Sequence, residues 1–311
     1  MEEGRFLLDV TSQYHPLTRL VHGDDYVSFD ELTELDPAAA EHGDAAFYLF
    51  RTDLIGRYAT SDRTEISLAV PYMRLSASVT QADEHHRNET AEGVGDMRLA
   101  LKRYFSHAEN FLFSASLGLS LPTGHVNRLT AASYLDHGAA DDLGIEIPNH
   151  SHLQLGTGTF DPEFGLQALY RLDSGWMWFG GLEVRVPFTE NRYDYRTAAS
   201  GSLDIGPALH IEGTRLTTAL FSEWLWAGRD RFDGDDIVGP GGTAEGTFGV
   251  PNTGRFEVSL KPTLTWDLGE GVTLNLQGRV PVYTRIHGGA AGGEVQLAES
   301  VGVYFGITTG F

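Results

Sequence analysis

Regular alternation of apolar and polar side chains is the feature that most restricts how this chain can fold. About twelve segments of the sequence carry apolar residues at every second position, the period of a β-strand. Each segment is long enough for the roughly 9–11 tilted residues with which a strand crosses a bilayer. The segments cover residues 5–14, 46–59, 64–76, 96–105, 111–121, 160–172, 175–188, 202–212, 214–227, 255–268, 272–282 and 301–311.

The stretch VTLNLQGRVPV (272–282) shows the pattern most clearly. Val272 and Leu274 point to one side of the predicted strand, and Thr273 and Asn275 point to the other. An apolar strand face needs cover, which is a second sheet in a soluble sandwich and lipid in a membrane barrel. The alternation therefore leaves both folds open, together with a β-helix.

The connections between the segments alternate in length. Short links lie at 61–64, 106–110, 173–175, 212–214 and 269–271, and long ones at about 15–45, 77–94, 122–156, 189–200, 228–252 and 287–294. Short turns at one rim and long loops at the other are typical of a transmembrane barrel with periplasmic turns and extracellular loops. The polar strand faces are rich in Gly, Ser and Ala with charges of both signs, which favours a crowded lumen over a water-facing sheet surface.

The charge balance excludes one class of partner. The 311 residues have a formal net charge of −21, and no cluster of Lys and Arg is present to neutralise nucleic-acid phosphates. Most of the excess negative charge falls in the long predicted loops. The chain has no cysteine, so it has no disulfide and no thiolate site. No apolar run is long enough for a membrane-spanning helix.

These observations predict a single all-β domain over residues 1–311: a transmembrane, antiparallel, up-and-down β-barrel of about 12 strands in the bacterial outer membrane. Charges on the polar faces must be hydrated or paired inside such a barrel. A barrel of this size is narrow, so we expect either a constricted pore or a filled interior. The lumen and constriction candidates are Arg51, Asp53, Arg98, Lys102, Glu183, Arg185, Glu257, Lys261 and Arg279.

Metal sites and catalysis have little support in the sequence. Asp230, Asp233, Asp235 and Asp236 offer oxygen ligands of the kind calcium prefers, but their spacing differs from that of an EF-hand loop. A solvated acidic loop is the simpler interpretation, and no cofactor is expected. Ser151 lies between two histidines, yet adjacency in sequence does not make a nucleophile and base pair.

Several stretches together resemble the family of outer-membrane transporter-like barrels labelled for the MetA pathway of phenol degradation, which is related to the fatty-acid channel group. The matching residues are GVGDMRLALKRYF (93–105), SASLGLSLPTG (114–124), LGTGTFDPEFGLQALYRL (155–172), WMWFGGLEVRVPF (176–188) and Phe311. The resemblance implies an outer-membrane barrel that passes small hydrophobic or aromatic compounds. Phe305, Ile307 and Phe311 also look like the signal read by the barrel-assembly machinery.

The expected function is therefore an outer-membrane channel for small solutes, of hydrophobic or aromatic character if the resemblance holds. The expected partners are the lipid bilayer, lipopolysaccharide, the barrel-assembly machinery and the solute itself, and we expect a monomer. One alternative is a structural barrel whose acidic loops bind partners and which conducts nothing. A second, less favoured alternative is an outer-membrane lipid hydrolase.

Overall fold

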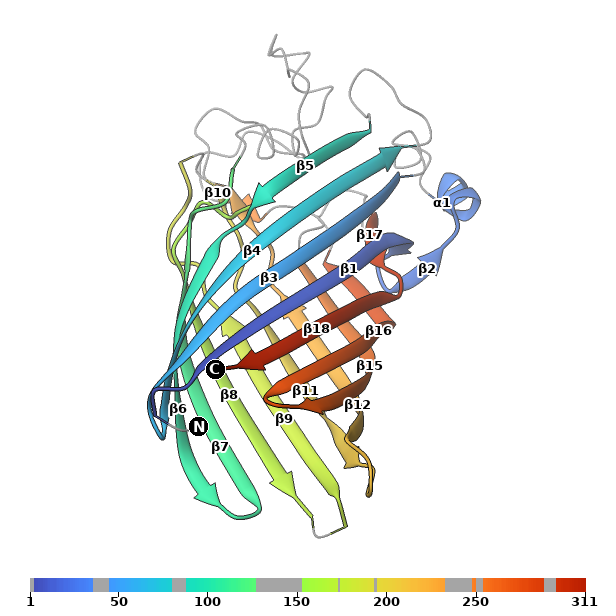
Figure 1. The fold of residues 1–311 in the computed structure, drawn as a ribbon. Coiled ribbons are helices and arrows are strands. Elements are labelled where there is room, and N and C mark those ends of the chain that lie inside the picture. The colour runs from blue at the N-terminus through green and yellow to red at the C-terminus, as the bar shows by residue number, and fades with distance from the viewer. Residues whose placement is uncertain are drawn as a thin grey trace.

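The computed structural model describes residues 3–35, 45–79, 88–126, 153–172, 174–192, 195–232, 248–249, 254–287 and 295–311. In this part of the chain, twelve long antiparallel strands form a closed barrel (Figure 1). Each strand overlaps one alternating segment of the sequence, so the predicted all-β barrel is confirmed. Two strands extend well beyond their predicted ends, β1 to His22 rather than residue 14 and β16 to His287 rather than residue 282. The wall strands are β1 (Phe6–His22), β3 (Ala45–Ser61), β4 (Thr64–Val79), β6 (Met97–Ala108), β7 (Phe111–Leu121), β8 (Asp161–Arg171), β9 (Trp176–Arg185), β11 (Ser200–His210), β12 (Leu216–Ala227), β15 (Gly254–Gly269), β16 (Val272–His287) and β18 (Gly302–Gly310).

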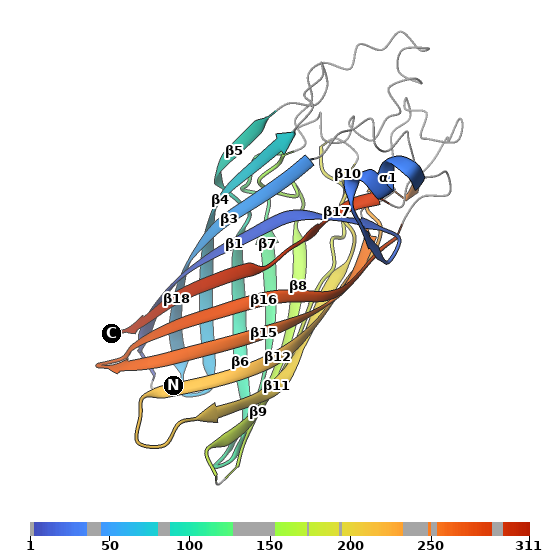
Figure 2. The same cartoon turned by 90° about the vertical axis from the view of Figure 1, so that its right-hand side faces the viewer.

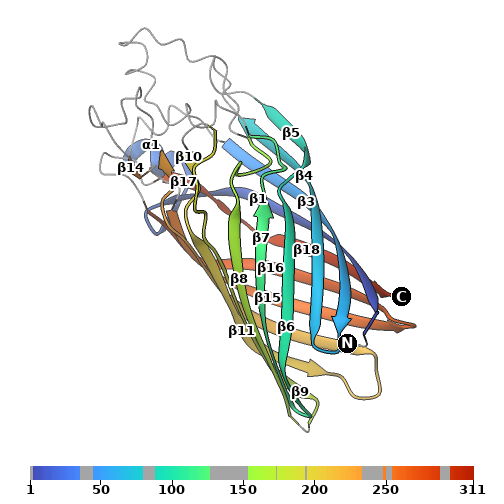
Figure 3. The same cartoon turned by 90° about the vertical axis from the view of Figure 1, so that its left-hand side faces the viewer.

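The first strand closes the barrel because it pairs along both of its edges. One edge of β1 runs antiparallel to β3, with Asp9 opposite Ile55, and the other runs antiparallel to β18, with Asp9 opposite Thr308. From β18 the wall continues through β16, β15, β12 and β11 (Figure 2) and returns through β9, β8, β7, β6 and β4 to β3 (Figure 3). Closure leaves the wall without the unpaired edge that an open sheet would expose.

The outer face of the wall is apolar. On β6, Leu99, Leu101 and Phe105 are exposed, whereas the alternate residues Arg98 and Lys102 face the interior. On the other wall strands, too, the exposed aromatic and aliphatic side chains fall on one set of alternate positions. An exposed apolar belt around a closed barrel is the surface that lipid covers.

The interior reverses the usual distribution of polarity. Among the described residues, the seven largest fully buried side chains include five that are polar or charged, namely Glu257, Thr159, Thr284, Asp161 and Ser259. A cluster of buried apolar residues formed by Val21, Ile286 and Ala298 lies where β1, β16 and β17 (Val295–Glu299) meet. Polar contacts rather than a hydrophobic core therefore organise the inside of the barrel.

The two rims differ as the sequence predicts. Both chain ends and the short turns lie at one rim, the lower one in Figure 1. Toward the other rim lie β2 (Asp25–Val27), α1 (Phe29–Leu35), β5 (Glu89–Val94) and β17, and a small separate sheet of β10 (Tyr195–Arg196), β13 (Arg231–Phe232) and β14 (Phe248–Gly249). No helix in the described part of the chain is long and apolar enough to cross a membrane.

Candidate functional site in the barrel lumen

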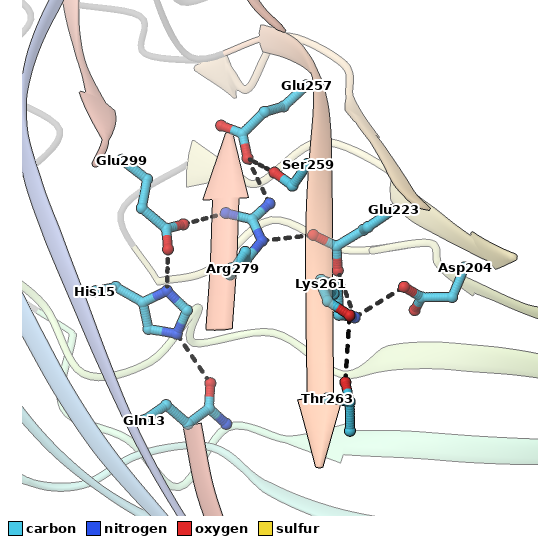
Figure 4. Close-up of polar contacts among 10 residues, drawn as sticks. All are labelled: Gln13, His15, Asp204, Glu223, Glu257, Ser259, Lys261, Thr263, Arg279 and Glu299. Atoms are coloured by element: carbon cyan, nitrogen blue, oxygen red, sulfur yellow. Dashed lines mark hydrogen bonds and ion pairs between the residues drawn. The ribbon is translucent and has the colours of Figure 1, made fainter. Parts of the chain in front are cut away.

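Arg279 is the centre of a large group of polar contacts inside the barrel (Figure 4). Its Nε atom donates to Oε2 of Glu223 at 2.5 Å, and its two terminal nitrogens donate to Glu257 and Glu299. Its side chain is only 4% exposed. Three carboxylates thus neutralise one buried guanidinium and join β16 to β12, β15 and β17, as a buried charge requires.

The contacts continue from this centre toward β11. The Nζ atom of Lys261 lies 2.8 Å from Oδ1 of Asp204 and 3.1 Å from Oε1 of Glu223, so Glu223 serves both Lys261 and the arginine (Figure 4). Ser259 donates to Oε1 of Glu257 at 3.2 Å. These polar side chains occupy the interior along β11, β12, β15 and β16.

The same chain of contacts runs in the opposite direction toward β3. Nδ1 of His15 lies 2.8 Å from Oε1 of Glu299, and its Nε2 lies 3.1 Å from Oε1 of Gln13 (Figure 4). Gln13 in turn donates to Asp53 at 3.1 Å, and Arg51 donates to both carboxylate oxygens of Asp53 at 2.6 and 2.8 Å. We call this continuous set of side chains the lumen network; its members are Gln13, His15, Arg51, Asp53, Asp204, Glu223, Glu257, Ser259, Lys261, Arg279 and Glu299.

A second, smaller set of charges lies closer to the rim of short turns. Arg57 donates to both carboxylate oxygens of Asp9 at 2.6 and 2.9 Å, and Thr308 donates to the same carboxylate at 2.5 Å. Lys102 donates to Oε1 of Gln167 at 2.6 Å. Cross-strand polar contacts therefore extend from the lumen network toward the rim of short turns.

A cavity remains on the other side of the lumen. A cavity of about 380 Å³ lies against the inner faces of β4, β6, β7, β8, β9 and β11. Its wall consists mostly of small side chains, including Ser116 and Gly118 on β7 and Ser200 and Ser202 on β11. Because these inward positions carry so little side-chain volume, they leave this space unfilled.

Four charged side chains also line this cavity: Arg98, Glu163, Glu183 and Arg185. Arg98 approaches Asp53 of the lumen network at 3.7 Å, so the cavity and the network are adjacent. Of the nine predicted lumen residues, the structure therefore places Arg51, Asp53, Glu257, Lys261 and Arg279 in the network, Arg98, Glu183 and Arg185 at the cavity, and Lys102 nearer the rim of short turns.

Asp96, at the bend between β5 and β6, holds three chain segments together. Its Oδ1 accepts the backbone N–H of Gly124 at 2.9 Å, and its Oδ2 accepts the N–H and hydroxyl of Thr157 at 2.7 and 3.0 Å. A Cβ atom on Gly156 would lie 2.9 Å from Cα of Gly124, so the two segments approach backbone to backbone. The glycine-rich motifs at 93–105, 114–124 and 155–172 thus meet at one carboxylate.

The residues predicted to act as an insertion signal lie on the outer surface. Phe305, Ile307 and Phe311 are 50%, 36% and 74% exposed. They share the lipid-covered side of the wall with the other outward apolar residues. Their role in assembly stays a prediction.

The predicted calcium ligands are only partly within the described residues. Asp230 accepts a hydrogen bond from the hydroxyl of Tyr195 and one from the backbone N–H of Ala198 at 2.7 Å. Burial raises the pKa of Asp230, and these two hydrogen bonds oppose that shift. Asp233, Asp235 and Asp236 lie outside the described residues, as do His150, Ser151 and His152 of the hydrolase alternative. No group of three or more metal-binding side chains occurs among the described residues.

Sequence reasoning missed several members of the site. His15 and Glu299 fell outside the predicted strands, in or beside predicted loops. The alternation that puts Asp9 and Gln13 inside, if continued by two positions, would have placed His15 inside as well. No local pattern marks Asp96 as the point where three motifs meet.

Comparison with known proteins gives similarity of fold rather than of sequence. No family model matches the chain, and no curated protein matches it. A solved outer-membrane channel from Pseudomonas putida F1 superposes with a TM-score of 0.69 at 14% identity, covering 100% of this chain and 97% of that one. The β-domain of the Bordetella autotransporter BrkA superposes with a TM-score of 0.50 at 10% identity, covering 100% of both chains. The chain therefore has the fold of bacterial outer-membrane β-barrels, and its predicted relation to outer-membrane transporter barrels is confirmed at the level of the fold.

Proposed function

We propose that this barrel is an outer-membrane channel that lets small solutes cross through the cavity in its lumen. The observation that carries the proposal is the cavity of about 380 Å³ beside the lumen network, because a barrel with a purely structural interior would fill this space with side chains. Glu183 on its wall is exposed, so water reaches the cavity. By the volume of liquid water, the space holds about a dozen water molecules.

Conductance across a planar bilayer tests the proposal, and the wall offers a matched pair of variants. Ser116 points into the cavity, whereas its neighbour Leu117 points to lipid and is 56% exposed. Ser116→Trp should lower the single-channel current severalfold by filling the cavity, and Leu117→Trp should leave it unchanged. Equal currents in both variants would place the conducting path elsewhere, and the absence of current in the unmodified protein would exclude a channel.

The structural alternative has one specific observation in its favour. Consecutive hydrogen bonds of the lumen network join β3, β1, β17, β16, β15, β12 and β11. Such contacts suit a barrel whose interior side chains serve only to stabilise the wall. A protein that carries no current and releases no solute from vesicles would be assigned to this class. The same refolded sample, incubated with phospholipid and calcium, tests the hydrolase alternative through released fatty acid.

The hydrophobic or aromatic class of solute implied by the resemblance stays a prediction. Phe179 and Phe221 on the inner faces of β9 and β12 lie with ring centroids 5.5 Å apart, and such a pair offers an apolar contact inside the lumen. Uptake of toluene into vesicles, compared between the unmodified protein and Phe179→Ser, tests that contact.

The expected partners are likewise proposals. The outward positions of Phe305, Ile307 and Phe311 support recognition by the barrel-assembly machinery, and we expect lipopolysaccharide around a monomeric barrel. Faster folding of the unmodified protein than of Phe311→Ala in the presence of that machinery, with equal rates in its absence, would support the insertion signal.

A further inference from the structure

The two arginines at the cavity differ from the other cations of the lumen in how weakly they are paired. Arg98 lies 3.7 Å from the nearest oxygen of Asp53, and Arg185 lies 3.8 Å from Asp161. The other lumen cations in ion pairs have a carboxylate oxygen at 2.5 to 2.8 Å. The side chains of Arg98 and Arg185 are also 36% and 35% exposed, and Nε of Arg98 is buried with no hydrogen-bond partner in the described structure.

The two carboxylates at the cavity are freer still. The side chains of Glu163 and Glu183 make no hydrogen bond and no ion pair with any residue in the described part of the chain. Glu163 lies opposite Arg185 in the β8–β9 register, and Glu183 precedes Arg185 by one inward position on β9. Two cations and two carboxylates therefore face one cavity without neutralising each other by direct contact.

The small residues of the wall keep these charges available. Gly118 lies opposite Glu163 on β7, and Ser200 and Ser202 lie opposite Arg185 and Glu183 on β11. The side chains directly opposite Glu163, Glu183 and Arg185 on β7 and β11 are thus no larger than serine. In the lumen network, by contrast, each cation has a carboxylate oxygen within 2.8 Å.

We propose that the cavity selects small dipolar solutes, which carry a carboxylate and a cationic nitrogen on one short chain, as amino acids do. A carboxylate on the solute would pair with Arg98 or Arg185, and its ammonium group would pair with Glu163 or Glu183. These charge-assisted hydrogen bonds replace the water that must otherwise hydrate the wall charges.

The balance of signs separates this class from others. The four wall charges sum to zero, so a solute with a single charge gains attraction from one pair and repulsion from the other. An uncharged polyol forms neither ion pair and offers the wall charges only hydrogen bonds from neutral groups, which are weaker than those between two charged groups. Only a solute with both signs satisfies both sets of groups.

Swelling of proteoliposomes measures the selection directly, with 4-aminobutyrate as the dipolar probe and erythritol as a neutral probe. The inference rests on the proposed channel, and erythritol entry alone tests whether a channel exists. We expect 4-aminobutyrate to enter up to about fivefold faster than erythritol, the ratio that one partly solvated ion pair supplies. The double variant Arg98→Gln/Glu183→Gln, which removes one charge of each sign, should bring the ratio toward one.

The matched control is Asp62→Asn/Arg63→Gln in the turn between β3 and β4, where the side chains are 72% and 55% exposed. It makes the same change in charge away from the cavity and should keep the unmodified ratio. Equal rates of entry of both probes through the unmodified protein would overturn the inference but not the proposed channel. This comparison needs no variant, so it holds even if the cavity variant fails to fold. An unchanged ratio in a folded cavity variant would also overturn it, whereas no entry of either probe would remove the channel itself.

Discussion

Arg279 on β16 and Glu223 on β12 are joined by a 2.5 Å ion pair that reaches across the intervening strand β15. The contact fixes the spacing of three adjacent strands from inside the barrel. The guanidinium is also shared with Glu257 and Glu299, so its removal would leave these two interior carboxylates without an arginine or lysine partner, and Glu223 with Lys261 alone. Loss of one partner from a buried ion pair costs more than the pair contributes.

Arg279→Gln should therefore lower the free energy of unfolding by about 3–5 kcal/mol. Urea unfolding followed by tryptophan fluorescence measures the change. Adding Glu257→Gln should recover part of the loss, because fewer carboxylates then lack a cation. Arg63→Gln, at an exposed turn, is the control and should cost less than about 0.5 kcal/mol. Similar losses in both single variants would mean that the lumen network does not stabilise the wall.

Asp96→Asn tests whether the Asp96 carboxylate holds the three glycine-rich motifs together. In the variant, an amide NH₂ group replaces one of the two carboxylate oxygens, and an NH₂ group cannot accept the hydrogen bond that Gly124 or Thr157 donates at that position. Loss of one hydrogen bond to a charged group should lower the free energy of unfolding by about 2 kcal/mol. Limited proteolysis should then cut within 122–126 or 153–160 at lower protease concentration than in the unmodified protein. Asp62→Asn is the matched control at an exposed turn. Unchanged cleavage in Asp96→Asn would show that packing alone holds these segments.

The wall of the barrel was predictable because lipid on one side and the lumen on the other impose a strict period of two. That period identified all twelve strands and the inward position of residues such as Arg98 and Lys102. It could not identify contacts set by closure of the barrel, such as that of His15 with Glu299, which lie 284 positions apart in the chain. Nor could it separate tightly paired charges such as Arg279 from loosely paired ones such as Arg185, since both occupy inward positions and differ only in their neighbours on other strands.

Glu270, in the turn between β15 and β16, adopts a φ of 52°. This left-handed conformation is unfavourable for a side chain with a Cβ atom, so Glu270→Gly should raise the free energy of unfolding by about 1 kcal/mol. Glu212, in the turn between β11 and β12, has no such conformation, since Glu270 is the only non-glycine residue with positive φ among those described. Glu212→Gly should therefore destabilise the protein by about 0.5–1 kcal/mol through chain entropy. Changes of the same sign in both variants would contradict this account.

Glu31 connects pH to the order of α1. Its carboxylate accepts the backbone N–H and the hydroxyl of Ser28, each at 2.8 Å, while the N–H of Glu31 donates back to the Ser28 hydroxyl at 3.2 Å, which forms a capping box. The backbone hydrogen bond and then the hydroxyl contact lower the pKa of Glu31 below its usual 4.5. The cap therefore stabilises the helix fully above pH 4.5 and loses its effect as the pH falls through the lowered pKa.

Amide hydrogen exchange at Leu32, corrected for the intrinsic rate, should accelerate over that acidic range in the unmodified protein. In Glu31→Gln the corrected exchange rate should be high at every pH. Glu34→Gln removes a charge from the same helix without touching Ser28, so its profile should follow that of the unmodified protein; a flat profile there as well would assign the effect to net charge instead of the cap.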